Sequence, residues 1–227
     1  MNQPPFRRVR AVALAALMLA WIVAAYLGSS GRGNPDFGVA VGVAPAALLF
    51  GAALWRAQRP LAALAVALLL AGALALLWPT LREHPARLFF AEHLGTHLAL
   101  ALLFGKTLFG AGEPLITRFA RLVHGPDMSE RKRRYTRRAT QAWTAFFLAN
   151  ASVSTLLYAL APQAVWSFYA SLLTAPLIGL MFAVEHVWRA HALPPEERPS
   201  LAQVVRAWGE RDAVRSGPVK HKPVKGA

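Results

Sequence analysis

Long apolar runs constrain the fold of this chain more than any other feature of its sequence. The first run, residues 9–27, contains one charged residue, Arg10, close to its start. The hydrocarbon core of a bilayer is about 30 Å thick, so a helix needs about 20 apolar residues to cross it. Five more runs of about this length follow, at residues 37–55, 61–78, 88–109, 142–161 and 164–188. The sequence therefore predicts an all-α fold, a multi-pass transmembrane helical bundle with six spans.

The first run also permits a second interpretation, because arginines precede an apolar stretch in secretory signal peptides as well. The run is long for such a signal, and the sequence GSSGRGNPD that follows it is a poor cleavage context. We therefore expect a retained span.

The basic residues predict the orientation of the spans. The net charge is +14 although 56% of the residues are hydrophobic, so charge and apolar character must be segregated along the chain. If the N-terminus is inside, only Arg32, Arg82 and Arg87 of the 25 lysines and arginines lie outside the cytoplasm. Cytoplasmic loops carry an excess of such residues. This bias predicts six spans with both termini in the cytoplasm.

Four segments follow from this topology. We expect a four-span membrane region at residues 1–109, and a cytoplasmic amphipathic helix with a basic loop at residues 110–138. A two-span hairpin then occupies residues 139–189. A cytoplasmic tail, partly disordered, occupies residues 190–227 and includes a short helix at about residues 201–208.

The cytoplasmic segment contains the predicted binding surface. Residues 113–125 begin with a proline at a helix-starting position, Pro114, and end at Gly125. Leu115, Ile116, Phe119, Leu122 and Val123 share one face, which is typical of a helix lying in the membrane interface. The expected lipid- or partner-binding residues are Arg118, Arg121, Arg131, Lys132, Arg133, Arg134, Arg137 and Arg138. Because the basic run lies directly between two spans, anionic membrane lipid is a more economical target than nucleic acid.

Ionisable residues inside a span are the main indication of chemistry, because each is costly in a bilayer unless it is paired or hydrated. Glu92, His93, Thr96 and His97 lie on one side of the fourth predicted helix. Interhelical hydrogen bonding, a proton or substrate role, and metal binding are all open. Two histidines alone do not make a metal site, so we predict none.

Glu185 and His186 form a second candidate pair, near the cytoplasmic end of the last span. Pairing of these residues with Arg189 or Lys106 is favoured over catalysis. Gly38 and Gly42 form a G-x-x-x-G pattern, which permits close packing within the subunit or in a homodimer. The chain contains no cysteine, which excludes disulfides, thiolate metal ligands and a cysteine nucleophile. We expect no cofactor.

Three stretches resemble a known family: GEPLITRFARLVHG at residues 112–125, RYTRR at residues 134–138 and APLIGLMFAVE at residues 175–185. The chain resembles a family of small bacterial inner-membrane proteins whose genes accompany aryl polyene and xanthomonadin-type pigment biosynthesis. The resemblance covers roughly residues 88–207 and implies a bacterial inner-membrane location. The family has no established catalytic residues. Members are sometimes labelled ketosynthases, but a ketosynthase holds its acyl chain on a cysteine, which this chain lacks.

Two hypotheses of function follow. The first is an accessory membrane protein that gathers an acidic acyl carrier protein or soluble biosynthetic enzymes at the cytoplasmic face. The second is a membrane-embedded enzyme, or a lipid-handling protein or transporter, that uses Glu92, His93 and His97, or Glu185 and His186.

Overall fold

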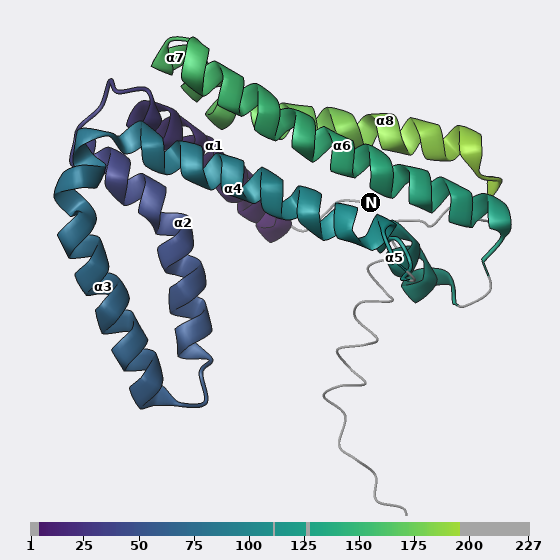
Figure 1. Ribbon diagram of the computed structural model, residues 1–227, viewed down its shortest axis with the longest axis horizontal. Coiled ribbons are helices and arrows are strands. Elements are labelled where there is room, and N and C mark those ends of the chain that lie inside the picture. The colour runs from purple at the N-terminus through teal and green to yellow at the C-terminus, as the bar shows by residue number, and fades with distance from the viewer. Residues whose placement is uncertain (1–4, 111, 126–127, 196–227) are drawn as a thin grey trace, which may run out of the picture. The chain divides into compact units, whose positions relative to one another are not determined.

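The computed structural model describes residues 5–110, 112–125 and 128–195, and within them every element is helical (Figure 1). The elements are α1 (Pro5–Ser29), α2 (Pro35–Trp55), α3 (Pro60–Glu83), α4 (Pro85–Gly105), the 3₁₀ turn η1 (Lys106–Leu108), α5 (Leu115–His124), α6 (Glu130–Leu160), α7 (Gln163–Phe168), the π-helical segment η2 (Tyr169–Leu173) and α8 (Thr174–Ala192). Six helical segments in this part of the chain are long and apolar enough to cross a membrane. The predicted all-α class and the number of membrane-length helices are confirmed.

The helices differ from the sequence expectation in two places. The fifth long helix, α6, begins at Glu130 rather than at residue 142, so the expected basic loop at residues 131–138 is helical. Ser129 begins the helix, because its hydroxyl accepts a hydrogen bond from the backbone N–H of Lys132 at 3.1 Å. Lysine and arginine are good helix formers, so the basic run continues the helix. The last membrane-length segment is also not one regular α-helix, because the π-helical η2 separates α7 from α8.

Prolines begin several helices, as the sequence suggests. α2 and α3 each have a proline in their first turn, Pro35 and Pro60, where a missing N–H costs no helical hydrogen bond. Asn34 caps α2 by accepting from the N–H of Asp36 at 2.8 Å. The amphipathic helix predicted at residues 113–125 is present as α5, with Pro114 just before its first residue. It ends at Gly125, whose φ of +85° suits glycine. The expected tail helix at residues 201–208 lies outside the described residues.

The chain divides into two compact units, each made of two stretches that are separate in the sequence. These units do not coincide with the four segments expected from the sequence. The first unit contains residues 5–101 and Phe146–Met181. The second contains Leu102–Ala145 and the described residues from Phe182 onward.

In the first unit, α1 packs on α2, and α2 packs on α3 in a hairpin (Figure 1). Asp36 at the start of α2 holds the end of α3. Its carboxylate accepts from the indole N–H of Trp78 at 2.8 Å and pairs with Arg82 at 3.0 Å. The ring of Phe90 on α4 stacks on Tyr158 of α6 with centroids 4.1 Å apart, and it meets Trp166 of α7 edge-on. Trp166 is fully buried.

The G-x-x-x-G pattern lies at a close approach between helices of the first unit. A Cβ placed on Gly38 would lie 2.8 Å from the carbonyl oxygen of Gly28 on α1. A Cβ on Gly42 would lie 2.7 Å from Leu88 on α4. The contact at Gly38 is with backbone and leaves no room for a side chain, whereas at Gly42 the Leu88 side chain would have to shift, so both glycines contribute to packing within the chain.

In the second unit, α5 is held by threonines. Its start has no side-chain cap of its own. Instead, Thr107 accepts from the N–H of Leu115 at 2.9 Å, and Thr140 accepts from that of Ile116 at 3.3 Å. These bonds satisfy two of the N–H groups that a helix start leaves free. The small core consists of Tyr135, Ala139 and Leu193, against which Ile116, Trp188 and Ala192 pack.

Candidate functional site

A histidine pair lies within the fourth membrane-length segment. His93 and His97 are one turn apart on α4, and their ring centroids are 4.2 Å apart. His97 is 3% exposed, and His93 and Glu92 are partly buried, whereas Thr96 is exposed. Of the four residues expected on one side of this helix, the two histidines are in contact, whereas Thr96 does not share their burial.

The pair belongs to a hydrogen-bond network that joins three helical segments of the first unit. His93 Nε2 lies 3.0 Å from the hydroxyl of Thr174, and its ring meets Tyr169 edge-on. The Tyr169 hydroxyl donates to Asn150 Oδ1 on α6 at 2.8 Å. The amide nitrogen of Asn150 donates in turn to the carbonyl oxygen of Phe146. These side chains are bonded to one another across helices, as polar groups in a bilayer must be.

The π-helical segment η2 makes this arrangement possible. On an α-helix, residues five apart lie about 140° from each other. A π-helix bonds residue i to residue i+5, which brings Tyr169 and Thr174 to one face, where the Thr174 hydroxyl donates to the Tyr169 carbonyl at 3.2 Å. Tyr169 could not be predicted as part of this arrangement, because helical periodicity in the sequence assumes a constant number of residues per turn. Single π turns inside helices occur frequently at functional sites.

Within the described residues, no group of three or more His, Cys, Asp or Glu side chains is placed to hold a metal ion.

Glu185 lies elsewhere, in the second unit, and its carboxylate is fully engaged. Tyr135 donates to it, and Arg189 one turn later donates to both of its oxygens. The predicted pairing with Arg189 is therefore present, whereas His186 is exposed. Because both oxygens of Glu185 are bonded and the residue is buried, this side chain is suited to holding α6 against α8 rather than to accepting a proton from a substrate.

Most of the basic residues expected between positions 131 and 138 are exposed, but one is buried. Five of them are exposed on the first turns of α6: Arg131, Arg133, Arg134, Arg137 and Arg138. Lys132 is a correction, because it is 4% exposed and already has an interaction partner. Arg131 and Arg137 also bind backbone carbonyls, those of Ala192 at 2.6 Å and Leu108 at 3.2 Å. Within the part of the chain that is described, none of the five exposed arginines forms an ion pair.

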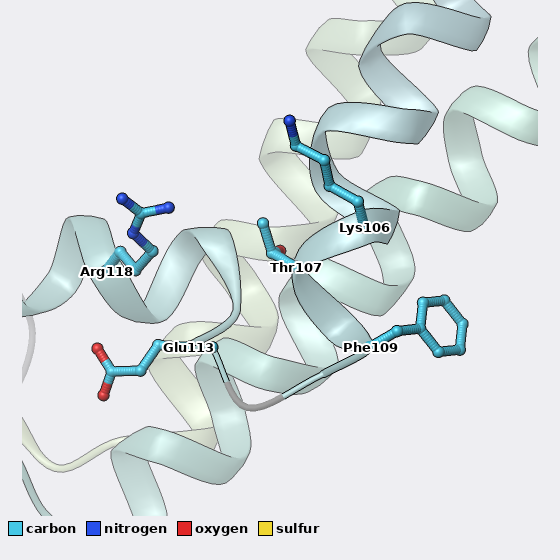
Figure 2. A pocket seen from close by; sticks show the side chains of 6 residues that line it. Lys106, Thr107, Phe109, Glu113 and Arg118 are labelled. Atoms are coloured by element: carbon cyan, nitrogen blue, oxygen red, sulfur yellow. The ribbon is translucent and has the colours of Figure 1, made fainter.

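The second unit also contains a hollow of about 400 Å³, which is lined by Lys106, Thr107, Phe109, Gly112, Glu113 and Arg118 (Figure 2). Lys106 and Arg118 come from different helices, η1 and α5, and both are exposed. The Glu113 carboxylate forms an ion pair with Arg121, so the charge of Arg121 is not available to a ligand. The hydroxyl of Thr107 is occupied by bonds to the backbone of Phe104 and Leu115. The hollow therefore presents two cations to a ligand.

Comparison with protein-family models, with curated proteins and with solved structures gives no match.

Proposed function

We propose that this chain is a bacterial inner-membrane accessory protein that docks acidic partners on a basic cytoplasmic surface. The partners are an acidic acyl carrier protein or soluble enzymes of aryl polyene or other lipid-type biosynthesis, together with anionic membrane lipids. The chain would cross the membrane six times with both termini inside. This orientation places the start of α6 in the cytoplasm, next to a partner that is made there.

The exposed arginines at the start of α6 carry this proposal. Arg133, Arg134 and Arg138 are exposed and make no ion pair with any described residue, so their charge is available to a partner. Because they lie on a helix rather than on a loop, their spacing is fixed before a partner binds. A preordered surface loses less conformational freedom on association than a flexible one.

The helix dipole does not favour basic residues in the first turn of α6. The start of a helix carries the positive end of its dipole, so cations there are unfavourable by about 0.3–1 kcal/mol each. The only acidic residue in the first turn of α6 is Glu130. The basic residues of this first turn, Arg131, Lys132 and Arg133, therefore gain nothing from the dipole, which is consistent with a role in membrane orientation or with a partner of negative charge.

The apolar face of α5 supports the same proposal. Ile116 packs into the small core, but Phe119 and Leu122 are 47% and 45% exposed. An uncovered apolar stripe beside a basic surface suits the headgroup layer of a membrane or the apolar rim of a docked protein.

Binding of a purified acidic acyl carrier protein tests the proposal. The chain is placed in nanodiscs of zwitterionic lipid, so that anionic lipid does not compete. In one variant Arg133, Arg134, Arg137 and Arg138 become Gln. The matched control changes Arg215, Lys220, Lys222 and Lys225 to Gln, which removes the same charge elsewhere. Exposed charge pairs contribute up to about 1 kcal/mol each, so the first variant should weaken binding roughly tenfold or more.

The salt dependence and the control decide the result. The difference between wild type and the first variant should shrink as ionic strength rises, because exposed charges are screened. The control should bind nearly as tightly as wild type. Equal weakening of binding in both variants would show that only net charge matters. Unchanged binding in the first variant would show that the arginines of α6 do not bind the carrier protein.

A second function, a membrane-embedded enzyme or lipid-handling protein, is favoured by one observation. The histidine pair on α4 is tied into a network with Tyr169 and Asn150 around a π-helical segment. That network is separate from the basic surface, and both can act in one protein.

A further inference from the structure

The hollow in the second unit lies at the end of a membrane-length segment. The fourth such segment extends from Pro85 to Leu108, so Lys106 belongs to its last turn and Phe109 follows directly after it. At the end of a span, the hydrocarbon of the bilayer gives way to the headgroup layer. When the chain is in a membrane, the hollow therefore lies at the depth of the lipid headgroups.

The two cations of the hollow are carried on a well-defined junction between η1 and α5. Lys106 comes from η1 and Arg118 from α5. Between them, the hydroxyl of Thr107 donates to the carbonyl oxygen of Phe104 at 2.6 Å and accepts from the N–H of Leu115 at 2.9 Å. These two bonds fasten the start of α5 to η1, so the backbones that carry the two cations are held in place before a ligand binds.

The charge presented by the hollow is positive. Lys106 and Arg118 are exposed and form no ion pair with any described residue. The acidic residue of the lining, Glu113, is paired with Arg121, and its carboxylate points away from Lys106 (Figure 2). Membrane orientation requires only that basic residues lie near the end of a span. It does not explain why two of them line one hollow.

Two neighbouring cations are complementary to a phosphomonoester. Such a group carries about −1.5 to −2 charges at pH 7 and three acceptor oxygens. The forked guanidinium of Arg118 can bind two of these oxygens, and the ammonium of Lys106 can bind another as a point charge. A phosphodiester carries a single negative charge, and in a zwitterionic lipid the cation of the headgroup compensates it. A diester therefore leaves part of the charge of the hollow unmatched.

The apolar surroundings of the hollow favour a lipid as the carrier of the phosphate. Phe109 lines the hollow and is 81% exposed. Phe119 and Leu122, on the same helix as Arg118, are also exposed. Exposed phenylalanine and leucine next to basic residues are typical of a helix that lies in the membrane interface. A free phosphate ion would make no use of these side chains, whereas the acyl chains of a lipid would cover them.

We propose that Lys106 and Arg118 bind the phosphomonoester headgroup of a membrane lipid, with Phe109 against the acyl chains. Basic pockets at the ends of spans bind anionic headgroups in this way. The site requires that the chain is in a membrane, but it does not use the arginines at the start of α6. Its failure and the failure of carrier-protein docking are therefore distinguishable.

Native mass spectrometry of the full chain in non-ionic detergent measures lipid binding, and three probes separate the headgroup from the chains. Dioleoylphosphatidic acid carries a phosphomonoester, dioleoylphosphatidylglycerol carries the same chains on a phosphodiester, and glycerol 3-phosphate carries the phosphomonoester without chains. We expect phosphatidic acid to bind about fivefold more tightly than phosphatidylglycerol, because the diester loses one exposed charge interaction. It should also bind more tightly than glycerol 3-phosphate, which lacks the apolar contact.

Charge variants connect this preference to the hollow. Lys106→Gln combined with Arg118→Gln removes both cations and should weaken the binding of phosphatidic acid about tenfold or more. The matched control, Arg56→Gln combined with Arg59→Gln, removes the same charge at the exposed turn between α2 and α3, which is another end of a span. This control should bind phosphatidic acid as wild type does. Lys106→Arg keeps the charge and should keep most of the affinity.

Several results would overturn the proposal. Equal affinity of wild type for phosphatidic acid and phosphatidylglycerol would mean that the phosphomonoester is not recognised, and this comparison needs no variant. Glycerol 3-phosphate binding as tightly as phosphatidic acid would place the ligand in water rather than in the membrane. Unchanged affinity in the Lys106 and Arg118 variant, or an equal loss in the Arg56 and Arg59 control, would place the lipid elsewhere on the chain.

Discussion

Replacing Arg189 should destabilise the second unit more than replacing Glu185, although the two form one ion pair. In Arg189→Met, the buried Glu185 carboxylate keeps its bond from Tyr135 but loses its cation. Breaking a buried pair by removing one partner costs about 3–5 kcal/mol. The Arg189 side chain is 29% exposed against 7% for Glu185, so we expect the lower end of that range, about 3 kcal/mol.

Glu185→Gln is the milder change. The glutamine side chain keeps an oxygen that accepts a hydrogen bond from Tyr135. The Arg189 guanidinium loses its carboxylate partner, but it is partly exposed and can be hydrated. We expect a cost of about 1 kcal/mol, which is typical of one lost hydrogen bond. The double variant removes both charges, so it should be more stable than Arg189→Met alone, with a coupling energy of about 1–3 kcal/mol.

Unfolding by sodium dodecyl sulfate in mixed micelles measures these values, followed by tryptophan fluorescence. Trp188 is a suitable reporter because its ring lies 5.3 Å from that of Tyr135. His186→Gln, at an exposed site, is the control and should change stability by less than about 0.5 kcal/mol. The reasoning is refuted if Arg189→Met matches this control, or if the two single changes simply add.

Two further predictions use the same assay. Gly38→Val should destabilise by about 1–3 kcal/mol through crowding against Gly28, whereas Gly51→Val, which meets nothing within 4 Å, should be nearly neutral; equal effects would contradict the close helix approach. Thr117→Val should cost about 1 kcal/mol, because it removes the 2.8 Å hydrogen bond to Thr136, whose hydroxyl still donates to the carbonyl oxygen of Arg133. Adding Thr136→Val should then cost little more, and strictly additive losses would show that the two hydroxyls do not depend on each other.

The helices were predictable because the apolar runs are long and the charges between them are dense. The adjacency of His93 and His97 was also predictable, since both lie in regular α-helix where a constant period holds. The contribution of Tyr169 was not, because it depends on a π-helical segment that leaves no pattern in the residues around it.

The start of α6 could have been found from the sequence. Ser129 followed by Glu130 is a helix-starting signal, and the lysine and arginines after it are good helix formers. The burial of Lys132 was not predictable, because it depends on how the helix is rotated against its neighbours in the second unit. Likewise, the pattern at Gly38 and Gly42 predicted a close approach without naming the helices involved.

The central claim is that the arginines of α6 face the cytoplasm in a chain that crosses the membrane. Because the chain has no cysteine, single substitutions Arg32→Cys and Arg133→Cys give unambiguous labelling sites without further changes. Intact spheroplasts treated with a membrane-impermeant maleimide should label Arg32→Cys, and should label Arg133→Cys only after the membrane is opened. Labelling of Arg133→Cys in intact spheroplasts would place the basic surface outside and contradict the account.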